Sequence, residues 1–274
     1  MKVRFTTLGC KLNFAESSAL GKELLSRGHQ RALQNEVPDV CVVNTCSVTD
    51  AADHKDRQAI NQLHRKYPNA IIVVTGCYAQ LQPEQIAKMD GVDFVLGQNE
   101  KYDIPALVDT LEAQLPHNAT PPLHTSTPLL HNSTPPLNHA IRVCNIREVD
   151  EFHGVHSGDD RTRCFIKVQD GCNYFCTYCT IPYARGKSRN PLISEVVADA
   201  QEALLQGAKE LIITGVNIGD FGRSTGETFI DLLRALDNLS PLALSPLASS
   251  PHRLVALPHP YFFLRAKLID GRDY

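Results

Sequence analysis

The chain has 274 residues, a net charge of −3 and 43% hydrophobic residues. This length allows two domains, and the hydrophobic content is enough for a buried core. The nearly balanced charge excludes a global basic field, so any RNA would have to be bound by a local patch. No apolar run, Ala70–Val74 included, is long enough to cross a bilayer, so we expect no membrane contact. Nine cysteines without a secretion signal favour reduced thiols and metal binding in the cytoplasm.

Strands and helices alternate along the first 115 residues. The apolar runs predict strands over residues 2–9, 40–45, 70–75 and 92–96. Helical periodicity and end signals predict helices over residues 14–27, 50–66, 83–89 and 102–115. This alternation predicts an α/β fold, in which residues 1–115 form an amino-terminal open parallel sheet with helices on both faces.

Three cysteines of this first domain follow predicted strands. Cys10, Cys46 and Cys77 each come just after the carboxyl end of a strand. These ends lie at one edge of an open parallel sheet, where ligands bind, so we expect the three thiols to converge. The alternative is three unrelated buried cysteines, because free cysteine is among the most buried residue types. We interpret Cys41 and Cys164 as such core residues.

The rest of the chain divides into three further parts. Residues 116–140 contain three consecutive heptads rich in Thr-Pro and predict an extended linker, whose histidines are not expected to bind metal. Residues 141–239 predict strands over 162–169 and 210–214 and helices over 191–206 and 228–238, the start of a partial (β/α) barrel. Residues 240–274 combine a short Ser-Pro-Leu repeat with a tail of no expected relation to the fold.

The most informative motif is a set of three cysteines with C-x3-C-x2-C spacing. Cys172, Cys176 and Cys179 offer three thiolates, whereas a cubane iron–sulfur cluster has four irons. One iron would therefore stay open to chelate a small molecule. The alternative is zinc, but closed structural zinc sites take four ligands and no second ligand pair lies nearby.

This run resembles the radical S-adenosylmethionine superfamily, and its flanks Asp170–Cys172 and Ile181–Gly186 resemble the methylthiotransferase family. Matches to the amino-terminal domain of that family occur at residues 9–13, 44–49 and 75–78. The sequence of Thr7–Asn13 resembles that of the branch that acts on threonylcarbamoyladenosine in tRNA. The branches that act on isopentenyladenosine or on a ribosomal protein usually read differently there. The resemblance covers residues 1–111 and 141–239.

The resemblance implies two [4Fe-4S] clusters and S-adenosylmethionine. One cluster would be held by Cys172, Cys176 and Cys179, and the auxiliary one by Cys10, Cys46 and Cys77. Tyr178 would lie against the adenine of S-adenosylmethionine, and Gly215 and Asn217 would meet its methionine part. The alternative for Tyr178 is an aromatic residue of the core, and the alternative for the segment with Gly215 is an ordinary end of a strand. No catalytic side chain is assigned beyond the cluster ligands.

The implied activity is addition of a methylthio group to carbon 2 of N6-threonylcarbamoyladenosine. The implied partners are tRNA and a reductant of flavodoxin or ferredoxin type. Arg185, Lys187 and Arg189 are expected either to contact tRNA phosphates or to form a solvated loop. Family members are longer, so we expect a truncated chain. The alternatives are an enzyme acting on a ribosomal protein aspartate and a fragment that binds a cluster without turnover.

Overall fold

The computed structural model describes residues 1–47, 49–114, 140–158, 163–208 and 210–239, and the backbone of 263–267. The predicted linker, apart from residue 140, and most of the predicted tail lie outside the described residues. The chain forms two compact units, Met1–Gly9 with Leu20–Ile146 and Cys10–Ala19 with Arg147–Tyr274. Helix α1 (Lys11–Ser26) therefore contributes its first half to the second unit.

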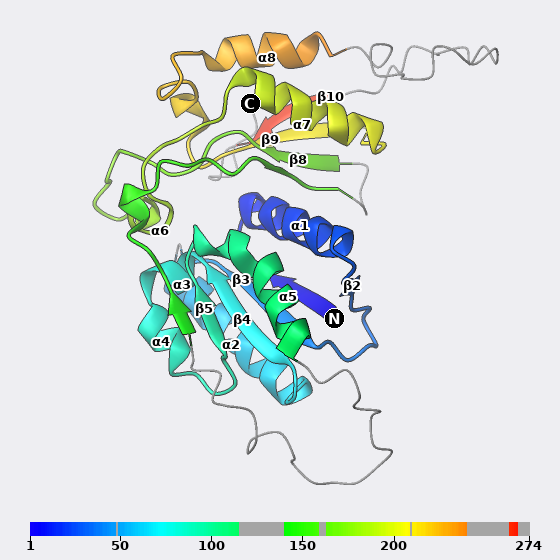
Figure 1. The fold of residues 1–274 in the computed structure, drawn as a ribbon. Helices are drawn as coiled ribbons and strands as arrows, with labels where there is room; N and C mark the ends of the chain where they lie inside the picture. Colours follow the sequence, from blue (N-terminus) through cyan, green and yellow to red (C-terminus); the bar gives the residue numbers. More distant parts are fainter. Residues whose placement is uncertain (48, 115–139, 159–162, 209, 240–262, 268–274) are drawn as a thin grey trace, which may run out of the picture. The chain divides into compact units, whose positions relative to one another are not determined.

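The first unit contains a six-stranded parallel sheet (Figure 1). Its strands follow the order β2-β1-β3-β4-β5-β6. They are β1 (Lys2–Thr7), β2 (Gln30–Arg31), β3 (Val40–Thr45), β4 (Ile71–Gly76), β5 (Phe94–Leu96) and β6 (Ala140–Arg142). The last strand joins Ala140, the last residue of the predicted linker, to Ile141 and Arg142, which the sequence predicted to open the second domain, and these residues pair with β5.

Helices cover both faces of this sheet, as the sequence predicted. They are α2 (Asp50–Lys66), α3 (Cys77–Leu81), α4 (Pro83–Ala87) and α5 (Ile104–Gln114), with a 3-10 turn η1 (Glu100–Asp103). Alternate strand residues point to opposite faces, so the unit has two apolar layers. Val42 packs with the second half of α1 and with α5. Cys41 and Val43 pack with α2, α3 and α4, which confirms that Cys41 is a core residue.

The second unit contains a four-stranded sheet in the order β10-β9-β8-β7. Its strands are β7 (Val155–His156), β8 (Arg163–Lys167), β9 (Glu210–Thr214) and β10 (Phe263–Lys267). The strands β8, β9 and β10 are parallel, whereas β7 runs antiparallel to β8. Five residues of the predicted tail thus form a strand beside β9. This α/β arrangement agrees with the predicted start of a (β/α) barrel.

Helices α7 (Ile193–Leu205) and α8 (Phe229–Asp237) pack on one face of this second sheet (Figure 1). Cys164, Ile166 and Val168 belong to that core, which confirms the interpretation of Cys164. Phe165 points to the other face and packs edge to face against Phe14 of α1, with 5.7 Å between the ring centroids. The unit is completed by short elements, α6 (Ile181–Arg185), η3 (Ile218–Asp220) and most of η2 (Ile146–Glu148).

Among the residues that the structure describes, no helix is both long and apolar enough to span a membrane.

Candidate metal and cofactor centre

The cysteines of the first sheet follow three neighbouring strands. In the sheet register, Thr7 of β1 pairs with Asn44 of β3, which pairs with Thr75 of β4. Cys46 and Cys77 each come two residues beyond this row, and Cys10 comes three residues beyond it. Cys46 and Cys77 are buried. Cys10 is grouped with the second unit, so its convergence with the other two thiols stays a prediction.

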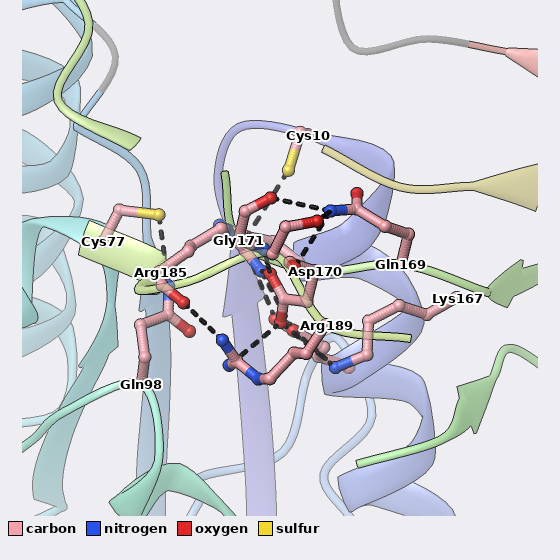
Figure 2. Close-up of polar contacts among 12 residues, drawn as sticks. Cys10, Cys77, Gln98, Lys167, Gln169, Asp170, Gly171, Arg185 and Arg189 are labelled. Atoms are coloured by element: carbon pink, nitrogen blue, oxygen red, sulfur yellow. Dashed lines mark hydrogen bonds and ion pairs between the residues drawn. The ribbon is translucent and has the colours of Figure 1, made fainter. Parts of the chain in front are cut away.

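Cys77 lies at the start of α3, directly after a glycine that no other residue replaces easily. Gly76 has φ of 100°, and a Cβ there would lie 2.4 Å from the carbonyl oxygen of Thr45. The Cys77 sulfur accepts a hydrogen bond from Nε2 of Gln98 at 3.1 Å (Figure 2). Gln98 in turn accepts a hydrogen bond at Oε1 from the buried Lys101. The Cys77 sulfur is therefore oriented before any ligand binds.

Cys46 is held through its backbone. Its N–H donates to Oδ2 of Asp56 at 2.9 Å. Burial raises the pKa of Asp56 to about 7, because a carboxylate loses hydration there, although the Cys46 N–H partly opposes this effect. The sequence offered no sign of this contact between a helix residue and the end of a strand.

The cysteine loop (residues 170–180) follows β8 in the second unit. Cys176 is exposed, and Cys172 and Cys179 are half-buried. The loop turns at Phe175, which has φ of 46°, and Cys179 N–H donates to the Cys176 carbonyl at 2.9 Å. Burial raises the pKa of Cys172 because the thiolate loses hydration there, the Tyr174 backbone N–H opposes this effect, and the nearby Asp220 adds to it.

Gln169 joins this loop to the exit of the neighbouring strand β9. Its Nε2 donates to the Gly171 carbonyl at 2.7 Å, and its Oε1 accepts from Asn217 N–H at 2.7 Å. A Cβ on Gly215 would lie 3.1 Å from Gln169 Cβ. Gly215 and Asn217 thus lie directly against the residue that supports the cysteine loop. Sequence reasoning missed Gln169, although it stands immediately before the Asp-Gly-Cys motif.

Asp220 also links the cysteine loop to the segment that follows β9. It is buried, and it accepts hydrogen bonds from Asn217 Nδ2 at 3.0 Å and from the Tyr174 hydroxyl at 3.1 Å. Tyr178 is 88% exposed, so it is not the core aromatic that was the alternative interpretation. It is accessible to a planar ligand at the loop surface.

The structure corrects the prediction for the cationic run. Arg185 was predicted to contact tRNA phosphates or solvent, but it is 1% exposed and pairs with Glu16 and Asp170. Its position in α6 directs the guanidinium into the unit (Figure 2). Arg189 also turns inward, donating to the backbone carbonyls of Glu151, Arg185 and Lys187. Lys187 alone of the three is largely exposed, and it pairs with Asp150 at 3.4 Å.

Other cations and aromatics lie at the surface around the loop. Arg147 is 5.0 Å from the ring of Phe175, and Arg223 is 5.6 Å from the ring of Tyr174. Tyr174, Phe175 and Arg223 are all exposed. Exposed aromatic rings beside guanidinium groups suit stacking on bases and pairing with phosphates. The sequence signal was the presence of aromatic residues inside the cysteine motif.

The donor chemistry of both cysteine sets fits iron–sulfur clusters. All nine cysteines are free thiols, and thiolates are the ligands of such clusters. Within the described ranges, no three His, Cys, Asp or Glu side chains are arranged so that they could hold a metal ion. Binding would therefore require the cysteine side chains to turn toward a common centre. The exposed Cys176 is free to do so.

Two protein families match the chain in separate regions. Residues 2–97 match the uncharacterized protein family UPF0004, and residues 166–246 match the radical SAM superfamily. A solved structure of the radical S-adenosylmethionine methyltransferase TsrM from Kitasatospora setae has a TM-score of 0.52 and 15% identity. That likeness covers 85% of this chain and 52% of TsrM, and at this identity it shows the fold alone.

Curated relatives narrow the family. The threonylcarbamoyladenosine tRNA methylthiotransferase MtaB of Aquifex aeolicus is 35% identical, over 91% of this chain and 56% of MtaB. The ribosomal protein uS12 methylthiotransferase RimO of Chloroflexus aurantiacus is 33% identical, over 88% of this chain and 52% of RimO. The chain thus spans about half the length of these relatives. Together, the two family regions and these relatives show that the chain belongs to the radical S-adenosylmethionine methylthiotransferase family and is MtaB-like in sequence.

Proposed function

We propose that this chain acts in tRNA modification, adding a methylthio group to carbon 2 of N6-threonylcarbamoyladenosine. The observation that carries the proposal is the cysteine loop, which follows β8 and is linked through Gln169 to the exit of β9. The name of the Aquifex relative and the wording of Thr7–Asn13 support the threonylcarbamoyladenosine substrate.

Two cysteine sets would hold two [4Fe-4S] clusters. Cys172, Cys176 and Cys179 would bind one, and Cys10, Cys46 and Cys77 would bind the auxiliary one. When bound, these clusters and S-adenosylmethionine supply the radical and sulfur chemistry, which no side chain can perform on an aromatic C–H bond. The chain's own residues bind, orient and shield these groups.

The binding of S-adenosylmethionine would use both sides of the loop. Tyr178 offers an exposed ring for the adenine. Gly215 and Asn217 offer backbone at the carboxyl end of β9, which is where ligands bind in folds of this class. Gln169 keeps that backbone beside the loop through its bond to Asn217 N–H.

The tRNA would be bound by local groups, since the chain has a net charge of −3. Lys187, Arg147 and Arg223 replace Arg185 and Arg189 as the cations for phosphate contacts, and Tyr174 and Phe175 supply rings for unstacked bases. The reductant would be of flavodoxin or ferredoxin type, and the place of action would be the cytoplasm.

The first test is the iron and sulfide content after anaerobic reconstitution. Two clusters predict about eight irons per chain, and one cluster predicts about four. Cys46→Ala and Cys176→Ala should each remove about four irons. Cys144→Ala is the matched control, because Cys144 is also a free thiol but belongs to neither set. Absence of iron in a folded protein would overturn the proposal.

The second test identifies the substrate. Nucleosides of tRNA from a deletion strain, with and without this chain restored, should differ in the methylthio derivative of threonylcarbamoyladenosine. A change instead in the mass of a ribosomal protein would favour the alternative that the Chloroflexus relative represents. Iron binding without cleavage of S-adenosylmethionine would favour a non-catalytic fragment.

A further inference from the structure

Four charged side chains are buried together in the second unit. This buried charge cluster consists of Glu16, Lys167, Asp170 and Arg185, each at most 4% exposed. Arg185 Nη1 lies 3.2 Å from Glu16 Oε1 and 3.0 Å from Asp170 Oδ1. Lys167 Nζ lies 3.4 Å from Glu16 Oε1 and 3.4 Å from Asp170 Oδ2, and Figure 2 shows Lys167 beside Asp170. Arg189 Nη2 adds a further contact to Asp170 Oδ2 at 3.7 Å, and the pairing of opposite charges limits the large desolvation cost of burying them.

The buried charge cluster extends toward Cys10 through Asn13. Oδ1 of Asn13 accepts a hydrogen bond from Arg185 Nη2 at 2.6 Å. The same oxygen accepts a longer bond from the Cys10 thiol, with 3.7 Å between Sγ and Oδ1. Asn13 is fully buried, so this oxygen has no competing water. One amide group therefore links a cysteine of the auxiliary set to the guanidinium of Arg185.

The buried charge cluster is connected to Cys172 in two ways. Asp170 Oδ1, which contacts Arg185, also accepts from Gly171 N–H at 2.9 Å. Cys172 N–H donates to the carbonyl of Gly186, the residue after Arg185, at 3.0 Å. A continuous series of polar contacts thus runs from the Cys10 thiol to the backbone of Cys172.

We propose that Arg185 is a positioning residue that keeps the segment after Cys10 and the cysteine loop in one fixed register. Its planar fork of five fixed donors reaches Asn13, Glu16 and Asp170 at once, a geometry that the compact ammonium of a lysine does not reproduce at this position. A buried ionic group is weak evidence for net stability, so we assign this one to conformational specificity. The consequence, that the segment after Cys10 and the cysteine loop keep a fixed spacing within the second unit, gains its functional meaning from the proposed function.

The test is hydrogen exchange of the metal-free full-length chain, followed by mass spectrometry. In Asn13→Ala, we expect exchange at the remote segment 169–175 to rise about tenfold, because local opening there loses its support. In Asp170→Asn, we expect exchange to rise reciprocally in residues 10–19. Arg185→Lys should loosen both segments.

The helix α7 provides the internal reference, and Arg234→Met is the matched control because Arg234 makes an exposed ion pair with Asp231 in the same unit. Exchange that rises only around the substituted residue would overturn the proposal, as would an equal rise in α7 or no change at all. Exchange is measured without an iron–sulfur cluster and without catalysis, so failure of this proposal is distinguishable from failure of the proposed function.

Discussion

Gln98 donates a hydrogen bond from its side-chain amide to the sulfur of Cys77 over 3.1 Å. Hydrogen bonds to cysteine sulfurs stabilise their negative charge and thereby influence the reduction potential of an iron–sulfur cluster. Both Gln98 and Cys77 are buried, so solvent does not weaken the bond.

Replacing Gln98 should therefore lower the reduction potential of the cluster bound by the Cys77 set. Gln98→Glu keeps an oxygen for Lys101 and removes the donor to the sulfur, whereas Gln98→Leu removes both. We also expect the affinity for the iron–sulfur cluster to fall about tenfold, as is usual when a group that hydrogen-bonds to a metal ligand is lost. A redox titration followed by electron paramagnetic resonance measures the potential. An unchanged potential in Gln98→Glu would contradict this role of the amide.

The backbone at Gly171 should be essential for the cysteine loop. Gly171 has φ of 70°, and a Cβ there would lie 1.9 Å from the carbonyl oxygen of Lys187. Gly171→Ala should therefore displace the loop and remove about four irons per chain on reconstitution. Gly207→Ala is the matched control, because Gly207 has φ of 94° but no atom within 4 Å of the added Cβ. It should cost only about 1 kcal/mol of stability and no iron.

Gln169 should affect S-adenosylmethionine more than iron. Gln169→Leu removes the acceptor for Asn217 N–H and the donor to the Gly171 carbonyl. We expect the Kd for S-adenosylmethionine to rise about tenfold, because a supporting residue is lost while the thiols remain. Gln206→Leu, at the exposed end of α7, should leave the Kd unchanged. Loss of iron in Gln169→Leu, with no selective effect on ligand affinity, would assign Gln169 a structural role only.

Much of the first unit is predictable from local sequence. The strand Val40–Thr45 and the helix Asp50–Lys66 have the predicted bounds. The strand is a short, almost continuous apolar run, and Thr49 begins the helix by accepting a hydrogen bond from Ala52 N–H. Such signals are contained within a few residues and do not depend on the rest of the fold.

The burial of Arg185 was not predicted, because it depends on residues far away along the chain. It belongs to a run with Lys187 and Arg189, and a dense cationic run usually lies in solvent. Its partner Glu16 is 169 residues away along the chain. Local patterns carry no information about such a pairing, and the same holds for β6 and β10, whose identity as strands depends on distant partners.

Burial of Cys41 should make stability depend on pH. Burial raises the pKa of its thiol from 9.0 to about 11. The folded state then holds the proton more tightly, so the free energy of unfolding should fall as pH rises from about 9 to about 11. Urea unfolding at pH 8 and pH 10.5 measures this change, and Cys41→Ala should reduce it. In the native protein at pH 8, Cys41 should also react with maleimide far more slowly than the half-buried Cys144.

The last prediction concerns β10, which pairs in parallel with β9 so that Arg265 faces Ile212 and Ala266 faces Ile213. In a parallel ladder, only alternate residues of an edge strand donate their N–H to the neighbour. Arg265→Pro and Ala266→Pro should therefore differ, because proline removes a bonding N–H from only one of them. The more damaging substitution should cost on the order of 1 kcal/mol and expose the edge of β9 to aggregation. Urea unfolding and light scattering measure both effects, and equal, negligible effects would show that these residues do not pair with β9.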